Sequence, residues 1–405
     1  MGEVRDAAGL PLEGVRVVEM GSLLAGPFCG QLLGDFGAEV IKVEPPGKGD
    51  PMREWGRHRK EGKTLWWPII ARNKKSLTLN LREKEGQELA RGLVATADVL
   101  VENFRPGTME RWGLGYEDLK EDNPGLVMVR VSGYGQTGPY RERAGFGAIG
   151  EAMGGIRHVT GFPDRPPPRV GISLGDSLAA TFGALGAVTA LFNREAGSGA
   201  GQVVDVGIYE AVLALMESTI PEYALAGQVR GRTGAILPFV APSNTYPTAD
   251  GDYIVIGANA DTVFARLAEA LGHPEWAESE RYATHNARGE NQEELDEEIS
   301  CWTQERVVDE VLEVMREAGV PAGKLFTAKD MVEDAHYAAR ENIVEVEDPE
   351  IGPFPMQNVV PHLSRTPGKV RRTGPRLGEH NDEVYGEVLG LGEKERDGLR
   401  ERGVI

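Results

Sequence analysis

The sequence predicts an α/β fold, in which an open and mostly parallel sheet forms a large domain and a smaller α/β unit follows it in the chain. Two observations predict this fold. Over the first 210 residues, short apolar runs alternate with segments of helical character, which is typical of β-α-β units with helices on both faces of a sheet. After Gly227 the sequence becomes rich in turn residues, and a unit of different character follows.

The elements of the large domain are expected in chain order. Strands are predicted where apolar residues run together or alternate, at residues 15–20, 39–44, 76–81, 98–102, 126–132 and 201–206. Helices are predicted at residues 28–36, 86–96, 176 to about 194, and 209–225. Because a helix separates several of the successive strands, these strands are expected to lie parallel.

The chain is divided into three segments. Residues 1–227 are assigned to the large domain, residues 228–325 to the smaller domain, and residues 326–405 to a C-terminal segment. The smaller domain is expected to contain one strand and two amphipathic helices, at 253–257, 264–271 and 307–318. From Asp330 on, the chain is rich in Pro, Gly and charge, so the last segment is expected to return to the large domain or to a partner chain.

The composition argues against several classes of function. The 405 residues carry a formal net charge of −19, which argues against a nucleic acid partner because phosphate backbones need a basic surface. The only cysteines are Cys29 and Cys301, so a reducing compartment is favoured. No apolar run reaches the roughly 18 residues of a membrane span, and residues 1–11 show no secretory signal. We therefore expect a cytoplasmic protein with no membrane partner and, because the His residues are scattered, no metal site.

Two glycine motifs suggest chemistry that their surroundings do not support. Residues 133–138 match G-x-G-x-x-G after a predicted strand, but a dinucleotide site also needs a helix to begin at once, and a proline and a polar stretch follow instead. Residues 171–175 match G-x-S-x-G, the nucleophile turn of serine hydrolases. The proline-rich segment before Ser173 makes a poor buried strand, yet a serine hydrolase with His362 or His380 as the base stays an alternative.

Asp176 is the candidate nucleophile. It stands at the start of a predicted helix that is rich in small residues, and Gly175 directly precedes it. One interpretation is structural, because Asp is a favoured N-cap residue of a helix. The other is catalytic. The positive end of a helix keeps a carboxylate ionised and oriented, Gly175 leaves room for a thioester, and a positioned, desolvated carboxylate is a competent nucleophile.

Basic side chains gather in the loops of the large domain, at Lys42, Lys74, Lys75, Arg82, Arg105, Arg111, Arg141 and Arg143. Each of them, taken singly, is most often an ordinary solvated charge. Their repeated place at predicted strand ends is more informative, since open α/β sheets bind ligands beyond the carboxyl ends of their strands. We therefore expect an anionic ligand there, with Phe104 stacking on a base and the arginines contacting phosphates.

Several segments also occur in an order shared with one known family. They are residues 12–19, 24–27, 37–44, 49–50, 73–76, 101–107, 133–135, 175–176, 199–206, 252–255 and 377–380. From residue 12 to the C-terminus, the chain resembles the class III coenzyme A transferases of the CaiB/BaiF type, which include formyl-CoA transferase and carnitine CoA-transferase.

This resemblance implies a fold, an activity and a set of site residues. Both chain ends are expected to build a large Rossmann-like domain, and two chains to interlock as a homodimer. The implied reaction transfers coenzyme A from an acyl-CoA to a carboxylic acid, with coenzyme A thioesters as substrates and no permanently bound cofactor. The catalytic aspartate corresponds to Asp176. The coenzyme A contacts correspond to Leu24, Ala25, Leu79, Asn80, Leu81, Arg82, Asn103, Phe104, Arg105, Arg111, Arg143, Ala144, Gly145, Phe146 and Gly147.

The chain departs from the family at several positions. Pro45 replaces an arginine after the second strand, and Ala144 replaces a lysine, with Arg143 beside it as a substitute. Leu24 replaces the glutamine that formyl-CoA transferase places near the acyl group, so oxalate is not a favoured acceptor. The glycine-rich loop over the family's active site corresponds to residues 257–260, whose composition leaves the role of a lid open.

The resemblance implies covalent chemistry, in which Asp176 forms mixed anhydrides and an aspartyl-CoA thioester. The same superfamily contains α-methylacyl-CoA racemases, which pair the aspartate with a histidine as acid and base. At the position of that histidine this chain has Phe146, which carries no exchangeable proton. A transferase is therefore favoured over a racemase, and a non-catalytic acyl-CoA-binding protein is a more distant alternative.

Overall fold

A computed structural model describes residues 9–405, so the expectation about a secretory signal in residues 1–11 lies mostly outside the described residues. The chain divides into two compact units. Unit 1 comprises the residues up to Ile156, Val170–Ile220 and Ala338–Ile405, and unit 2 comprises Arg157–Arg169 and Pro221–Tyr337. Unit 2 is longer at both ends than the segment 228–325 expected from the sequence, and it also takes in an earlier segment.

Unit 1 is built on a six-stranded sheet in which all neighbouring strands are parallel. In spatial order the strands are β5 (Lys74–Thr78), β2 (Glu39–Glu44), β1 (Arg16–Glu19), β6 (Val99–Glu102), β7 (Val127–Ser132) and β8 (Val203–Gly207). The chain extends the sheet from β1 in one direction, then returns and extends it in the other. This is a Rossmann-type strand order that reverses between β1 and β6, so the predicted α/β class is confirmed.

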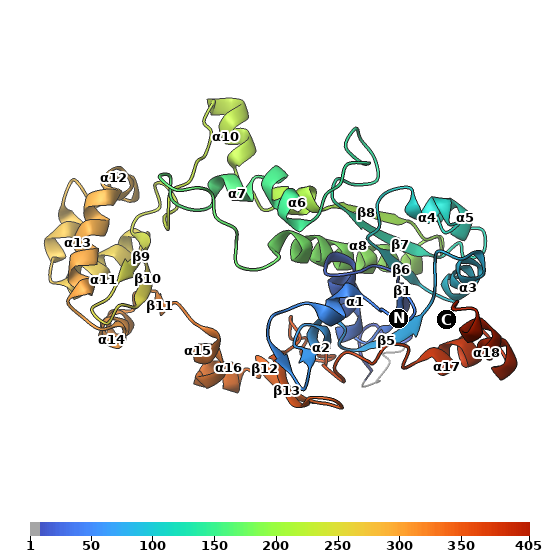
Figure 1. Cartoon of the computed structure of the whole chain (residues 1–405). Helices are drawn as coiled ribbons and strands as arrows, with labels where there is room; N and C mark the ends of the chain where they lie inside the picture. Colours follow the sequence, from blue (N-terminus) through green and yellow to red (C-terminus); the bar gives the residue numbers. More distant parts are fainter. Residues whose placement is uncertain (1–8) are drawn as a thin grey trace, which may run out of the picture. The chain divides into compact units, whose positions relative to one another are not determined.

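Helices cover both faces of the sheet (Figure 1). On one face lie α1 (Ala25–Asp35) and α8 (Leu174–Ala196), whose small residues pack against the valines of the strands. On the other face lies α3 (Lys84–Val94), together with the C-terminal elements η3 (Val384–Val388) and α18 (Glu393–Glu401). The end of the chain therefore completes the core of unit 1, as the fold prediction required.

Hydrogen bonds hold this C-terminal segment against the outer strand β5. The Tyr385 hydroxyl donates to the Thr78 carbonyl oxygen over 2.6 Å, and the Asn381 side-chain amide donates to the Thr78 hydroxyl over 2.7 Å. The backbone N–H of His380 donates to the Ser76 carbonyl oxygen over 3.1 Å. These bonds satisfy polar groups of an edge strand that would otherwise face solvent.

The start of α8 differs from the expectation. The helix begins at Leu174, so Asp176 lies within its first turn, and the N-cap position is Ser173, whose side chain makes no capping hydrogen bond. The interpretation of Asp176 as an N-cap residue is therefore wrong. By length and composition α8 is also able to cross a membrane, the one such helix among the described residues. Its buried alanines pack on α1 and the sheet, and we interpret it as a core helix.

The helix expected at residues 209–225 is interrupted. The structure has two shorter helices instead, α9 (Ile208–Leu213) and α10 (Thr219–Ala226). Pro221 explains the break, because proline has no N–H to donate and is tolerated only near the start of a helix. Between the two helices Glu217 takes a positive φ of 48°, which one continuous helix could not contain.

Unit 2 contains an antiparallel three-stranded sheet, with strands β9 (Ser243–Pro247), β10 (Tyr253–Gly257) and β11 (Ala322–Lys324). Its main helices are α11 (Asp261–Leu271), α13 (Gln292–Gln304) and α14 (Val308–Ala318). Apolar residues of these strands and helices form a separate core. The strand and both helices expected from the sequence are present, with boundaries within a few residues of those predicted.

Candidate active site and coenzyme-binding cavity

The reversal of strand order brings two loops together at the carboxyl edge of the sheet. One follows β1 and contains Ser22, and the other follows β6 and contains Asn103. The Asn103 amide joins them, because its Oδ1 accepts the Ser22 N–H over 2.8 Å and its Nδ2 donates to the Ser22 carbonyl oxygen over 2.9 Å. Open α/β sheets bind ligands at this point of reversal.

A cavity of about 670 Å³ lies at this edge, and we call it the switch-point cavity. Its walls come from the loops after β1, β2, β5 and β6 and from the C-terminal Gly403. Five of the residues expected to contact coenzyme A line it: Leu79, Asn80, Leu81, Arg82 and Phe104. The volume is in the range of small-molecule and cofactor sites.

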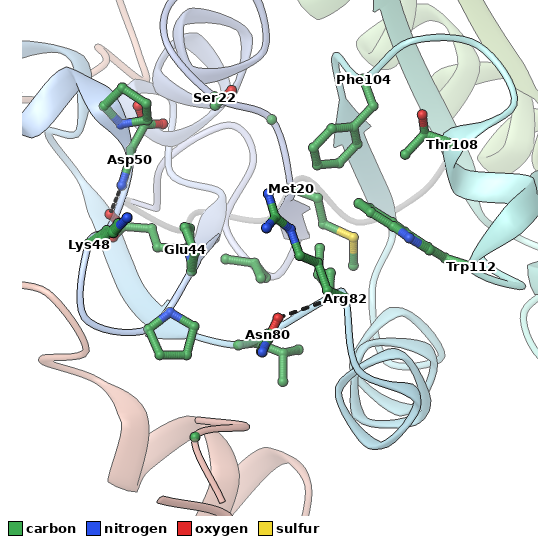
Figure 2. Close-up of a pocket in the computed structure, with 18 residues that line it drawn as sticks. Met20, Ser22, Glu44, Lys48, Asp50, Asn80, Arg82, Phe104, Thr108 and Trp112 are labelled. Carbon is green, nitrogen blue, oxygen red and sulfur yellow. Dashed lines mark hydrogen bonds between the residues drawn. The ribbon is translucent and has the colours of Figure 1, made fainter.

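The switch-point cavity has an aromatic side and a charged side. Figure 2 shows Phe104 and Trp112 on one side and Lys48 with Glu44 and Asp50 on the other. The rings of Phe104 and Trp112 pack edge to face, with centroids 5.2 Å apart. A partly exposed aromatic ring at a phosphate-binding edge is suited to stack on a nucleotide base.

Sequence reasoning missed Lys48 and Trp112, which both line this cavity. Lys48 stands in the segment Pro-Pro-Gly-Lys-Gly-Asp directly after β2. Its place after a strand is the same signal that identified Arg82.

Buried charges hold the loop after β1 in place. The Lys42 ammonium lies 3.0 Å from a carboxylate oxygen of Glu19 and 2.9 Å from one of Asp50, and it donates to the Gly21 carbonyl oxygen over 2.7 Å. The Asp50 carboxylate in turn accepts the Leu23 N–H over 3.1 Å. Leu23 has a positive φ of 65°, a strained conformation that this bond helps to maintain.

The pKa values of this network follow from its pairing. Burial alone would raise the pKa of the Asp50 carboxyl, but the Lys42 ammonium and the Met52 N–H outweigh it, so the pKa lies below its usual value. Burial would likewise lower the pKa of Lys42, yet the carboxylates of Glu19 and Asp50 raise it overall. Both groups are therefore charged at neutral pH and bind each other. Lys42 is consequently not available to a ligand.

Two other basic residues singled out in the sequence are also engaged within the fold. Lys74 is fully buried and pairs with Glu19 over 2.7 Å. Lys75 pairs with Glu39 and with Glu383, each over 2.5 Å. These lysines support the sheet and its C-terminal covering, and they do not line the switch-point cavity.

Arg105 and Arg111 line a second cavity of about 650 Å³, which we call the arginine cavity. Arg141 lines it as well, and so does Arg130, which is paired with Glu102 and Glu110. The arginine cavity shares the segment after β6 with the switch-point cavity. Of the predicted cations, Arg82 therefore lines the switch-point cavity, and Arg105, Arg111 and Arg141 line the arginine cavity.

Of the predicted contacts at residues 143–147, Gly147 lies against the nucleophile, as the first residue of α6 (Gly147–Met153). A Cβ atom placed on Gly147 would lie 2.2 Å from Oδ2 of Asp176, so the Gly147 backbone faces this carboxylate directly. Gly145 packs against Gly133 and Tyr134 in the loop after β7. Ala144, Arg143 and Phe146 are exposed, and the Arg143 guanidinium stacks on the Tyr140 ring with 3.6 Å between its Cζ and the ring centroid.

Asp176 itself is half-buried at the start of α8. The preceding Gly175 is buried, and its N–H donates to the Glu151 carboxylate of α6 over 3.2 Å. A side chain on Gly175 would lie 3.0 Å from the Gly147 carbonyl oxygen. Glycines on both elements therefore permit α6 and α8 to approach closely around the carboxylate.

Leu24 and Ser177 line a third cavity of about 590 Å³, the α1 cavity, between α1 and α2 (Trp67–Ile70). Ser177 adjoins Asp176 in the chain, so this cavity reaches the neighbourhood of the candidate nucleophile. Ala25 is the buried first residue of α1. The predicted contacts at Leu24 and Ala25 are therefore separate from the switch-point cavity.

Other candidate nucleophiles and motifs have structural explanations. Burial raises the pKa of the Cys29 thiol to about 12, so it is not a thiolate at neutral pH. The residues directly before Ser173 form no strand, and His380 contacts Ser76 and Arg372. No helix follows the glycines of residues 133–138 until α6 begins.

Within residues 9–405, no group of three or more His, Cys, Asp or Glu side chains is arranged to hold a metal ion.

The strand order defines a Rossmann-type α/β protein, with the switch-point cavity at the place where the strand order reverses. The chain belongs to CoA-transferase family III, which matches residues 12–381. It is 65% identical to succinyl-CoA–D-citramalate CoA-transferase of Chloroflexus aurantiacus, with 98% of each chain covered. It is 44% identical to the alpha subunit of succinyl-CoA–L-malate CoA-transferase of the same organism, with 98% of this chain and 93% of the relative covered.

Solved structures agree with this family. A CaiB/BaiF family protein from Brucella suis superimposes with a TM-score of 0.83 at 35% identity, covering 94% of this chain and all of that one. Rv3272 from Mycobacterium tuberculosis gives a TM-score of 0.81 at 30% identity, covering 92% of this chain and 98% of that one. The chain is therefore an enzyme with CoA-transferase activity, which uses acyl-CoA thioesters and carboxylic acids as substrates.

Proposed function

We propose that this enzyme transfers coenzyme A from succinyl-CoA to a small hydroxydicarboxylic acid, with Asp176 as the covalent nucleophile. The observation that carries the mechanism is the position of Asp176, half-buried in the first turn of α8 with its carboxylate against the Gly147 backbone. The positive end of a helix favours the ionised form of a carboxylate. Glycines of α6 and α8 lie beside the carboxylate, and because they have no side chains they leave it uncovered.

Each step of the proposed reaction breaks one bond as another forms. The Asp176 carboxylate attacks the acyl carbon of the donor, and the carbon–sulfur bond breaks to give a mixed anhydride and coenzyme A thiolate. The thiolate attacks the aspartyl carbonyl and releases the donor acid, which leaves an aspartyl-CoA thioester. The acceptor carboxylate then displaces the thiolate to form a second anhydride. The thiolate finally attacks the acceptor's acyl carbon, which gives the new acyl-CoA and restores Asp176.

This sequence conserves the free energy of the thioester, so it needs no ATP. Both anhydrides react readily with water, and the site must therefore exclude it. Coenzyme A must also stay bound after the first step, because its thiolate is the nucleophile of the second and the last. Tight anchoring of the nucleotide end, in the switch-point cavity, would serve this need.

The choice of substrates rests on the relatives and on Leu24. A relative that is 65% identical over nearly the whole chain acts on succinyl-CoA and D-citramalate, as its name states. Others are named for L-malate and for glutarate. Leu24 lines the α1 cavity beside Ser177 with an apolar side chain, which supports an acceptor that carries carbon between its carboxylates rather than oxalate.

We further propose that the enzyme acts as an interlocked homodimer in the cytoplasm. Support for the dimer comes from α8, whose face away from the sheet exposes Leu185, Val188 and Phe192, the first by 60% and the last by 74%. These positions follow one another at helical spacing. An apolar stripe of this kind on a chain with a net charge of −19 is suited to a second copy of the same chain.

A product assay tests the proposed reaction. The enzyme is incubated with succinyl-CoA and, in turn, with D-citramalate, L-citramalate, L-malate, glutarate or oxalate, and the acyl-CoA products are measured by mass spectrometry. We expect a new thioester with a hydroxydicarboxylic acid, formed in equal amount with free succinate, and none with oxalate. Release of succinate without a new thioester would contradict transfer and indicate a hydrolase.

A second arm of the assay separates transfer from racemisation. A chiral 2-methylacyl-CoA is incubated in heavy water without any acceptor acid. We expect no deuterium at the α-carbon, because Phe146, at the position of the racemase histidine, carries no exchangeable proton. Uptake of deuterium that is lost in Asp176→Ala would show that the enzyme is a racemase.

A further inference from the structure

We propose that Lys48, together with Arg82, binds the 3′-phosphate of coenzyme A in the switch-point cavity. Lys48 stands in the turn directly after β2, three residues beyond Pro45. This inference rests on the proposed function, and it adds to that function a residue and the chemical group that the residue recognises.

The charges that line the cavity favour an anionic ligand. Glu44 and Asp50 line it, but both are neutralised from within the fold: Glu44 by Arg53 over 2.7 and 2.8 Å, and Asp50 by Lys42 over 2.9 Å. Lys48 and Arg82 also line it. Among residues 9–405, neither of these two cations has an ion-pair partner. The cavity therefore presents two uncompensated positive charges in a strongly acidic chain.

The turn that carries Lys48 is held at a defined place. The Gly49 N–H donates to the Pro45 carbonyl oxygen over 3.0 Å, and Gly47 and Gly49 have positive φ values of 75° and 68°. Next to it, the Asp50 N–H donates to the Glu44 carboxylate over 2.9 Å. The prolines before these glycines restrict the backbone, so the turn loses little conformational entropy when a ligand binds. Such a turn presents Lys48 at the cavity in a constant position.

The chemistry of coenzyme A selects the phosphate. Its diphosphate leads onward to the pantetheine arm, which must reach Asp176, whereas the 3′-phosphate is a terminal group on the ribose. With the base stacked on Phe104, the two anionic groups need two cationic sites. The structure offers the Lys48–Arg82 pair in the switch-point cavity and Arg105 with its neighbours in the arginine cavity. A phosphate monoester is close to a dianion at neutral pH, which matches a pair of single positive charges.

Comparison of two ligands in one variant tests this assignment. The dissociation constants of coenzyme A and of 3′-dephospho-coenzyme A are measured by calorimetry for the wild type, for Lys48→Ala and for Lys48→Arg. We expect Lys48→Ala to bind coenzyme A about tenfold more weakly, the order of a lost charged hydrogen bond, while its affinity for the dephospho compound is unchanged. Lys48→Arg should restore most of the discrimination.

An exposed lysine outside the cavity serves as the matched control. Lys120→Ala removes the same charge at a position that lines neither cavity, and it should leave both affinities unchanged. If Lys48→Ala weakens both ligands equally, or neither, the assignment to the 3′-phosphate is overturned while the coenzyme A site stands. If the wild type binds neither ligand, or if Phe104→Ala leaves coenzyme A binding unchanged, the proposed site itself is wrong.

Discussion

At the residue scale, the contact between Gly147 and Asp176 gives the sharpest test of the site geometry. Gly147→Ala would place a Cβ atom 2.2 Å from Oδ2 of Asp176, closer than two such atoms can lie, so the carboxylate must move. A misplacement of about 1 Å can cost 100-fold in rate. We expect kcat to fall by about that factor while the melting temperature hardly changes.

The control for this variant is Gly171→Ala. Gly171 lies shortly before α8, and a Cβ atom there meets no other atom within 4 Å. Its rate should equal that of the wild type. Equal and unimpaired rates in both alanine variants would show that the Asp176 carboxylate is not positioned for chemistry as the structure indicates.

The buried carboxylates beneath the switch-point cavity predict a loss of stability in acid. The pKa of Asp50 is lowered by Lys42 and the Met52 N–H despite burial, and the pKa of Glu44 is lowered by Arg53 despite burial. A folded-state pKa below the unfolded value contributes stability above the unfolded pKa, which is lost as the pH falls through the folded value. The contribution of these two groups to the free energy of unfolding should therefore be level from pH 7 to about 5 and fall below about pH 4.

Urea unfolding curves measured at several pH values test this expectation. Asp50→Asn removes one of the two depressed groups, so it should lower the stability at pH 7 and make the curve less steep below about pH 4. A variant that keeps the full acid dependence of the wild type would contradict the role given to the Asp50–Lys42 pair.

Single residues were predictable from the sequence to very different degrees. Arg82 and Phe104 were identified because they follow apolar runs, and position after a strand is visible in a sequence. Lys48 follows a strand equally, yet its importance appears only when Lys42 is seen to be buried and paired. Gly147 was expected to contact coenzyme A, and its closeness to Asp176 depends on how two helices pack, which no local pattern encodes.

At the scale of elements, glycines set how closely α8 lies on the sheet. A Cβ atom on Gly186 would approach a Val204 methyl group to 2.4 Å, whereas one on Gly92 in α3 would meet only Leu389 at an ordinary 3.6 Å. Alanine is favoured over glycine in a helix by roughly 0.5–1 kcal/mol. Overpacking costs about 1–3 kcal/mol. We therefore expect Gly186→Ala to destabilise the protein and Gly92→Ala to stabilise it.

Urea unfolding of the two variants gives the comparison directly. Each variant adds one methyl group to the interior of a helix, so helix propensity changes by the same amount in both. A difference in sign can arise only from packing. If both variants gain the same stability, α8 does not lie against β8 as closely as the structure has it.

Strand cores were predicted better than element ends. The strand that was expected at residues 76–81 is observed at Lys74–Thr78. Its register with β2, which pairs Val40 with Lys74 and Glu44 with Thr78, sets these ends. That register depends on a partner strand far away in the chain. The same shift matters for function, since it frees residues 79–82 from the sheet to line the switch-point cavity.

At the scale of the whole molecule, the exposed stripe of α8 predicts assembly. Leu185 and Phe192 lie on this stripe, more than half exposed. Sedimentation or light scattering should give a dimer for the wild type. The double substitution Leu185→Glu and Phe192→Glu should weaken or abolish it. A wild-type chain that stays monomeric at micromolar concentration would contradict the proposal.

The division into two units was only partly accessible from the sequence. The change of character after Gly227 was visible, and the core of the second unit lies where it was expected. The segment Arg157–Arg169 belongs to this unit although it lies far earlier in the chain. It has few apolar residues and little regular structure, so no periodic pattern could reveal where it packs.

The most direct test of the covalent mechanism is the mass of the Asp176 peptide during turnover. The enzyme is mixed with succinyl-CoA in the absence of acceptor, quenched in acid, digested and analysed by mass spectrometry. We expect coenzyme A to be bound as a thioester to Asp176, in an adduct that disappears when a hydroxydicarboxylic acid is added. The variant Asp176→Ala should show neither adduct nor transfer. An adduct on Ser173, or full transfer by Asp176→Ala, would contradict the covalent role of Asp176.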